Sequence, residues 1–176
     1  MARIALVGMP GAGKSSIGRQ LGRRLQIPFD DSDHVIEQRL GCSIRAYFER
    51  EGEAAFRDVE AKVIAELCGA ASTGILATGG GAVLQPANRL NLHTHCKVVY
   101  LHSTPEDIFR RVRHDVNRPL LQVDDPMQRL RDLYAVRDPL YRETAHFIIE
   151  TGRPSVAMLV NMILMQLELA GEAPSA

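Results

Sequence analysis

The segment Gly8-Met9-Pro10-Gly11-Ala12-Gly13-Lys14-Ser15 has the residue types and the spacing of a loop that binds nucleotide phosphates. Its glycines let the backbone turn tightly enough to aim a row of N–H groups at phosphate oxygens. The lysine of such a loop reaches the β- and γ-phosphates, and the hydroxyl that follows it can bind Mg²⁺. We therefore expect phosphate contacts from Gly11, Ala12, Gly13, Lys14, Ser15 and Ser16.

The residues on either side of this loop support the same interpretation. Ile4 to Val7 form a short apolar run, which is typical of a buried parallel strand. Ile17, Leu21 and Leu25 recur at helical spacing and predict a helix with one apolar face. Strand, loop and helix follow in the order that brings phosphates to a helix N-terminus. This order argues against the alternative, a glycine-rich turn with a chance Lys-Ser pair.

The rest of the chain alternates apolar runs with helical periodicity. We expect further strands near 27–33, 74–78, 97–101 and 147–149, and helices near 34–40, 52–68, from 104 onward, 127–144 and 155–169. Strands that alternate with helices predict an α/β domain, whose five-stranded parallel sheet is covered by helices on both faces. A single domain is expected over 1–170, followed by a frayed tail at 171–176.

Composition limits the kinds of partner. Lys plus Arg and Asp plus Glu both number 21 in 176 residues, so the formal charge is zero. A protein that binds nucleic acid or a membrane surface would carry a basic excess. No apolar run approaches the ~20 residues that span a bilayer, and the first strand leaves no space for a signal peptide. Cys42, Cys68 and Cys96 are odd in number and widely spaced, which favours reduced thiols. We expect a cytoplasmic monomer.

Two absences and one segment narrow the class of phosphate-loop protein. The sequence has no Asn-Lys-x-Asp motif for guanine and no Asp-x-x-Gly after the third predicted strand, which argues against a GTPase switch. Segment 113–125 contains two arginines and a proline and has no regular periodicity. A small domain with such a segment favours a kinase for a small acceptor, in which a lid closes over both substrates and excludes water.

Six motifs in one order resemble the shikimate kinase family over residues 3–169. Besides the phosphate loop they are Asp31-Ser32-Asp33, Phe56-Arg57, Gly79-Gly80-Gly81-Ala82-Val83, Arg118-Pro119-Leu120-Leu121 and Arg137-Asp138-Pro139-Leu140-Tyr141. The resemblance implies ATP-dependent phosphorylation of the shikimate 3-hydroxyl, on the route to chorismate and the aromatic amino acids. It also implies the fold of the nucleoside-monophosphate kinases, with a substrate-binding segment near 34–60 and a lid near 113–125.

Asp31 and Asp33 lie two apart on a predicted extended segment, so their side chains should point to the same side. Two adjacent carboxylates repel each other unless a metal or a donor compensates. The resemblance implies that Asp31 supports Mg²⁺ together with Ser15, since the third strand ends in Ala77-Thr78 without an acid. It implies that Asp33 binds substrate hydroxyls and orients or deprotonates the attacking oxygen. Capping of the next helix by Asp33 is the structural alternative.

Arg57 and Arg137 are candidates for binding the substrate carboxylate. Arg57 follows Glu53 by four residues, so it could instead form an ordinary surface ion pair on a helix. Arg137 could be a solvated helix charge. A planar guanidinium suits two-pronged carboxylate binding, and the resemblance favours that role for both.

Glycines and further arginines complete the expected site. Gly79, Gly80 and Gly81 could form merely a tight turn. They also leave backbone N–H donors exposed, and the resemblance implies that they contact the substrate. It also implies that Arg118 closes from the lid onto the β- and γ-phosphates. Arg111 and Arg153 match the family's adenine-binding positions loosely, with Arg110 and Arg113 as competitors.

Three rival interpretations stay open. A kinase of the same fold could act on gluconate or on a nucleoside monophosphate. A nucleotide-binding module without activity would be free to lose Lys14, Ser15, Asp33 and Arg118, all of which are present. His93, His95 and Cys96 suggest a zinc site, but a fourth ligand at the usual spacing is missing.

Overall fold

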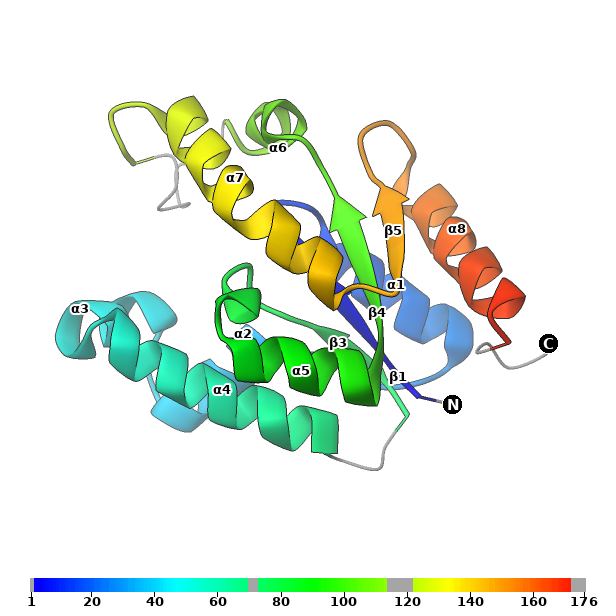
Figure 1. Ribbon diagram of the computed structural model, residues 1–176, viewed down its shortest axis with the longest axis horizontal. Helices are drawn as coiled ribbons and strands as arrows, with labels where there is room; N and C mark the ends of the chain where they lie inside the picture. The colour runs from blue at the N-terminus through cyan, green and yellow to red at the C-terminus, as the bar shows by residue number, and fades with distance from the viewer. Residues whose placement is uncertain (1, 70–72, 114–121, 172–176) are drawn as a thin grey trace.

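The computed structural model describes residues 2–69, 73–113 and 122–171, and within them a five-stranded parallel sheet runs through the molecule (Figure 1). The strand order is β2-β3-β1-β4-β5. The strands are β1 (Arg3–Val7), β2 (Phe29–Asp31), β3 (Ile75–Ala77), β4 (Cys96–His102) and β5 (Phe147–Glu150). Because the order is not sequential, helices must connect the strands across the two faces. The predicted fold class is confirmed.

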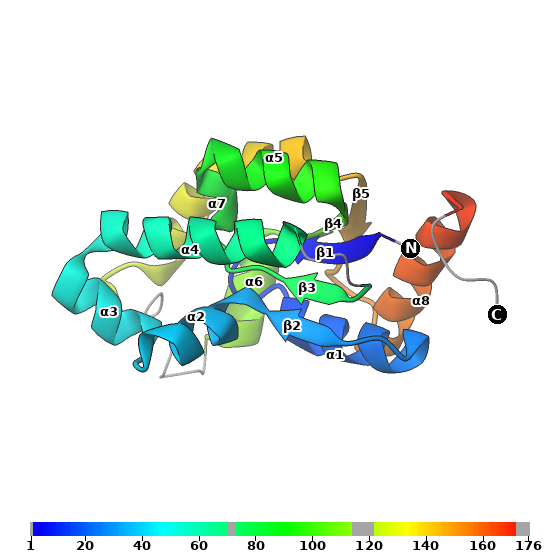
Figure 2. The same cartoon turned by 90° about the horizontal axis from the view of Figure 1, so that it is seen from below.

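Helices cover both faces of this sheet (Figure 2). They are α1 (Lys14–Leu25), α2 (Ser32–Leu40), α3 (Ile44–Glu51), α4 (Glu53–Gly69), α5 (Pro86–His95), α6 (Pro105–Val112), α7 (Pro126–Thr144) and α8 (Val156–Leu169), with a 3-10 turn η1 (Ala82–Leu84). Figure 2 shows α4, α5 and α7 on one side of the sheet and α1 and α8 on the other.

Alternation along β1 explains the two hydrophobic cores. Ile4 and Leu6 point to the face covered by α1 and α8, where they join a cluster with Leu21. Ala5 and Val7 point to the opposite face, which α4, α5, α6 and α7 cover. All five residues of β1 are buried, as expected for the central strand of a sheet with two covered faces.

A smaller third cluster holds α2, α3 and α4 together at one end of the molecule. Ile36, Phe56 and Val63 form its buried centre, and the Phe48 ring lies 4.7 Å from that of Phe56. These helices occupy the predicted substrate-binding segment. Helix α3 was not predicted, because none of its residues is fully buried and its apolar face is short.

The sequence predicts the starts of two helices, α6 at Thr104 and α2 after Asp33. The Thr104 hydroxyl accepts a hydrogen bond from the Asp107 N–H at 3.1 Å and caps α6, with Pro105 as its first residue. The second prediction was wrong: α2 begins at Ser32 and not at His34, and its cap is Asp31. Asp33 lies inside the first turn of α2, so capping is excluded as its role.

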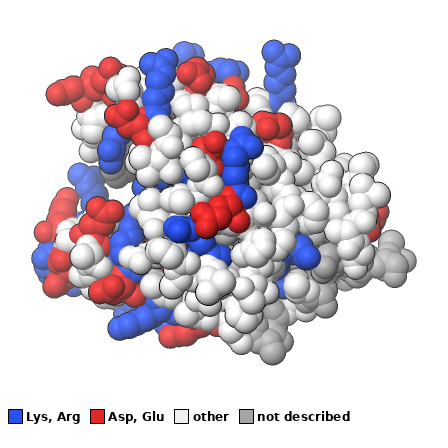
Figure 3. Space-filling view, in the orientation of Figure 1, with Lys and Arg blue, Asp and Glu red and all other residues white. Residues whose placement is uncertain are grey.

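Some expectations concern residues outside the described parts of the chain. Most of the predicted lid, including Arg118, and nearly all of the predicted tail fall there. Among the described residues, no helix combines the length and the apolar character needed to cross a membrane. On the face shown in Figure 3, acidic and basic side chains lie interspersed.

Leu21 should contribute strongly to stability, because its side chain is fully buried between α1 and the sheet. Leu21→Ala is expected to lower the free energy of unfolding by about 2–5 kcal/mol, measured by urea denaturation. The matched control is Leu90→Ala on α5, where the side chain is 68% exposed and the loss should stay below about 0.5 kcal/mol. Equal losses in the two variants would contradict the assignment of the core.

Candidate active site

The phosphate-binding loop joins β1 to α1 at the carboxyl end of the central strand. Gly11 and Gly13 have φ values of 85° and 92°, in the left-handed region that glycine adopts without strain. Gly13 is the N-cap of α1, so the first N–H groups of this helix face the space above the loop. The loop therefore has the backbone geometry that the sequence predicts for anion binding.

A cavity of about 350 Å³ adjoins this loop. Lys14, Ser15 and Ser16 line one side of it, and Asp31 and Asp33 line another. The Lys14 ammonium donates hydrogen bonds to the carbonyl oxygens of Gly8 at 2.6 Å and Met9 at 3.0 Å. In this position the ammonium lies against the wall of the cavity and is directed along the loop.

Ser15 and Asp31 place two oxygen ligands together. The Ser15 hydroxyl donates to Asp31 Oδ2 at 2.8 Å, while Asp31 Oδ1 accepts from the Asp33 N–H at 3.0 Å. A hydroxyl oxygen beside a carboxylate oxygen fits Mg²⁺, which prefers hard oxygen ligands. β3 supplies no acid here, since its residues are Ile-Leu-Ala, and the Thr78 hydroxyl that follows donates to the Leu6 carbonyl at 3.1 Å.

Asp33 lies in α2 rather than in the strand, so it does not share an extended segment with Asp31 as the sequence predicts. Both carboxylates nevertheless line the same cavity. Burial raises the pKa of Asp33 to about 6, and the negative charges of Asp31 and Glu60 act in the same direction. Lys14 opposes them by favouring the charged form. Asp33 is thus a carboxylate whose protonation changes around pH 6.

A second cavity, of about 180 Å³, opens beside the first. The two share Pro10, Asp33, Gly79 and Gly80 in their walls. The second is completed by Ile44, Phe56, Arg57, Glu60, Gly81 and Arg137. The arrangement therefore joins a phosphate-binding space to a small pocket with two guanidinium groups.

Arg57 belongs to this pocket and not to the surface. Its side chain is 13% exposed, and Nη1 donates to Glu60 Oε1 at 2.9 Å. The predicted pair with Glu53 also exists, with 3.5 Å between Nη2 and Oε1. The partner that is buried with Arg57 is Glu60, three residues along α4.

Glu60 was missed by the sequence analysis. It is 1% exposed, and burial raises the pKa of its carboxyl while Arg57 and Arg137 lower it. The spacing of Arg57 and Glu60 puts them on one helix face with Phe56 and Val63, and that was the available signal. By itself, such a pair resembles an exposed ion pair on a helix.

The three glycines after β3 each leave space for one pocket residue. A Cβ on Gly79 would lie 2.6 Å from Asp33 Oδ1, and a Cβ on Gly81 would overlap the Arg57 guanidinium. A Cβ on Gly80 would lie 2.7 Å from Pro10 and 3.2 Å from the guanidinium of Arg137. Bare backbone at these positions therefore lets the charged groups approach the loop.

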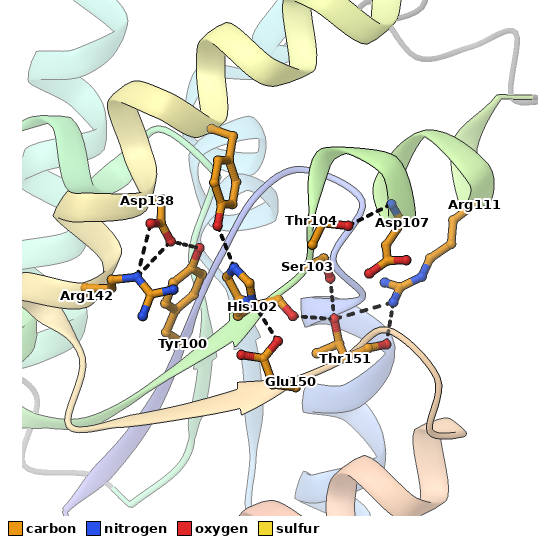
Figure 4. Close-up of polar contacts among 11 residues, drawn as sticks. Tyr100, His102, Ser103, Thr104, Asp107, Arg111, Asp138, Arg142, Glu150 and Thr151 are labelled. Carbon is orange, nitrogen blue, oxygen red and sulfur yellow. Dashed lines mark hydrogen bonds and ion pairs between the residues drawn. The ribbon is translucent and has the colours of Figure 1, made fainter.

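Helix α7 brings Arg137 to this loop through three polar contacts. The Tyr141 hydroxyl donates to the Gly80 carbonyl at 2.5 Å. The Tyr100 hydroxyl in β4 donates to Asp138 Oδ1 at 2.8 Å, and His102 Nε2 lies 2.6 Å from the Tyr134 hydroxyl (Figure 4). Tyr134, Asp138 and Tyr141 follow each other at helical spacing, so one face of α7 is fixed on the sheet.

Arg111 lies where the phosphate loop meets the segment after β5 (Figure 4). Its guanidinium donates to the Thr151 carbonyl at 2.5 Å and, at 3.4 Å, to the carbonyls of Gly11 and Ala12. Arg153 is exposed two residues after Thr151. Arg111 thus lies beside the phosphate loop, and Arg153 follows on the segment that Arg111 contacts. Their adenine-binding roles stay predictions.

The residues considered as a zinc site have separate partners. His93 Nδ1 lies 3.0 Å from the Thr144 carbonyl oxygen, and its ring stacks on that of His146. Cys96 is buried against Cys68, and His95 is exposed. Across the described parts of the chain, no group of three or more His, Cys, Asp or Glu could hold a metal ion.

A parallel sheet with a phosphate loop, beside a small pocket that holds two arginines, defines a P-loop kinase with a small acceptor. The sequence model of the shikimate kinase family matches residues 10–168. The chain therefore belongs to the shikimate kinase family.

Individual relatives agree with this assignment. The chain is 60% identical to shikimate kinase of Paracidovorax citrulli, covering 97% of this chain and 94% of the relative. It is 50% identical to that of Thiobacillus denitrificans, covering 98% and 94%. The solved structure of shikimate kinase from Acinetobacter baumannii in complex with shikimate is 46% identical, with a TM-score of 0.90 and coverage of 98% and 95%.

A gluconokinase structure from Sinorhizobium meliloti is more distant. It is 17% identical to this chain, with a TM-score of 0.61 and coverage of 97% and 94%. At this identity the likeness concerns the fold alone.

Asp33 should make stability depend on pH. Its pKa in the folded state, about 6, exceeds the ordinary value of 3.8, so the folded chain binds the proton more tightly. The resulting stabilisation is complete below about pH 4 and is lost as the pH rises through about 6. Asp33→Asn removes this dependence. The free energy of unfolding of the variant, relative to that of the unmodified chain, should therefore increase between about pH 4 and pH 6 and then level off.

Urea denaturation at a series of pH values measures the effect. The control is Asp132→Asn at an exposed position of α7. If Asp33→Asn and the unmodified chain have parallel pH profiles, the raised pKa of Asp33 is wrong.

Proposed function

We propose that this chain transfers the γ-phosphoryl group of ATP to the 3-hydroxyl of shikimate, giving shikimate 3-phosphate and ADP. The proposal is carried by the pocket that places Asp33, Arg57 and Arg137 directly beside the phosphate-binding loop. Membership of the family and the likeness to the Acinetobacter enzyme, solved with shikimate, support the choice of acceptor.

Arg57 and Arg137 bind the shikimate carboxylate in this proposal. They enter the pocket from different helices, and guanidinium groups match the planar shape of a carboxylate. Glu60 holds Arg57 at 2.9 Å and so restricts the orientation of its planar fork. Gly79, Gly80 and Gly81 then offer backbone contacts to the ring of the acceptor.

The second substrate occupies the larger cavity. The N–H groups between Gly11 and Ser16 bind the phosphates, and Lys14 leaves the carbonyls of Gly8 and Met9 to neutralise the transferring group. Ser15 and Asp31 would hold Mg²⁺, which neutralises charge on the β- and γ-phosphates when it is bound. We assign Arg118 to the lid, as the resemblance implies, and Arg111 and Arg153 to the adenine.

Asp33 contacts the acceptor hydroxyl. With a pKa of about 6 it is mostly ionised at neutral pH, so it can accept a hydrogen bond from that hydroxyl and fix the attacking oxygen. In a loose phosphoryl-transfer transition state, the proton need not leave early. Orientation is therefore the main contribution of Asp33, and acceptance of the proton follows bond formation.

We propose that the enzyme is active as a monomer. We also propose that the reaction takes place in the cytoplasm, where ATP is available.

ADP release from MgATP, with shikimate, gluconate or a nucleoside monophosphate as acceptor, tests the proposal. Shikimate alone should stimulate turnover by at least about 100-fold over the water reaction, because its compact ring presents a carboxylate to both arginines and a hydroxyl to Asp33 at the same time. Gluconate tests the rival carboxylate-bearing acceptor. Stimulation by gluconate but not by shikimate would overturn the choice of acceptor, whereas ATP binding without any stimulation would favour a binding module.

Arg57→Lys should raise the KM for shikimate by about tenfold or more and leave the KM for ATP within about twofold, because lysine cannot form the two-pronged contact. The matched control is Arg45→Lys on α3, an exposed arginine that also pairs four residues along its helix. Steady-state kinetics in both substrates measure the effect. Equal increases in the two KM values would contradict a carboxylate contact.

A further inference from the structure

Two of the three cysteines meet in the fold. Cys68 lies in the last turn of α4 and Cys96 is the first residue of β4, and their Sγ atoms are 3.9 Å apart. Cys96 is paired in the sheet with Arg3, at the start of β1. The thiols therefore lie at the amino-terminal edge of the sheet, whereas the phosphate loop follows the carboxyl end of β1.

The surroundings make the two thiols unequal. The side chains of Cys68 and Cys96 are 7% and 4% exposed, so only a small reagent could reach them. The contact with the Cys96 thiol lowers the pKa of Cys68, and the positive charge of Arg3 acts in the same direction. The same contact and burial raise the pKa of Cys96. Cys68 is thus the thiol that ionises first.

We propose that Cys68 and Cys96 form an oxidation site for hydroperoxides, at which one intramolecular disulfide is made. The Cys68 thiolate attacks one oxygen of hydrogen peroxide, the O–O bond breaks, and Cys68 becomes a sulfenic acid. The hydroxide that leaves takes up the proton that the Cys68 thiol released and becomes the first water. The Cys96 sulfur then attacks the Cys68 sulfur, the S–O bond breaks, and water leaves with the Cys96 proton. Overall the two thiols lose two electrons and two protons, and hydrogen peroxide is reduced to two molecules of water.

The disulfide would connect the end of α4 to the sheet. The two cysteines are 28 residues apart in sequence, so the cross-link would restrict the unfolded chain more than the folded one. Arg57 and Glu60 lie in the first half of α4, about two to three turns of helix before Cys68. Oxidation should therefore raise the melting temperature by a few degrees and leave both KM values within about twofold.

Treatment of the full chain with hydrogen peroxide tests the site. Intact mass should fall by two hydrogen atoms, and digestion without reductant should yield one cross-linked pair of peptides that contain Cys68 and Cys96. A dithiol should reverse both changes. The cross-link should form at least about ten times faster than Cys42 is oxidised. The Cys68 and Cys96 sulfurs are already 3.9 Å apart, whereas Cys42 lies away from both, between α2 and α3.

Variants separate this site from general thiol oxidation. Cys42→Ser should still form the cross-link, whereas Cys96→Ser should leave a sulfenic acid on Cys68 that dimedone traps. Peptide mapping of the oxidised, unmodified chain needs no variant. It therefore tests for the Cys68–Cys96 cross-link even if a serine substitution destabilises the core. Recovery of unlinked Cys68 and Cys96 after Cys42 has been oxidised, with the fold intact by circular dichroism, would overturn the proposal.

Discussion

Repulsion among carboxylates is the constraint on which the site depends. Asp31, Asp33 and Glu60 gather around two small cavities, and burial raises the pKa of both Asp33 and Glu60. Such groups stay charged only where cations are held close to them. Lys14 acts on Asp33, and Arg57 with Arg137 act on Glu60. The cations that we propose for binding anionic substrates are thus the same cations that stabilise the carboxylates.

Close approach of these charges requires bare backbone. A Cβ on Gly79 or Gly81 would collide with Asp33 or Arg57, and one on Gly80 would collide with Pro10. The Tyr141 hydroxyl fixes the middle of this turn through the Gly80 carbonyl, and the same helix carries Arg137. Positions of the charges are therefore set by contacts between β3, α4 and α7, which are far apart in the sequence.

Local signals in the sequence are sufficient for the phosphate loop and the fold class. The loop needs only left-handed glycines, a lysine and a hydroxyl in consecutive positions, and the alternation of strands and helices repeats along the chain. Asp33, Arg57 and Arg137 could be selected because motifs flank them. Their assigned roles, and that of Arg118, stay predictions. Helix α3 was missed by the sequence analysis, because its short apolar face resembles the sequence of an exposed segment.

The sequence by itself determined the class of nucleotide loop, the α/β architecture and the family, because each is encoded in neighbouring residues or in a repeated order. Only the tertiary structure decided that Glu60 is buried with Arg57, that Asp31 rather than Asp33 caps α2, and that Cys68 meets Cys96. Burial and partnership depend on which strands become neighbours. In a parallel sheet, that order joins residues that no local pattern connects.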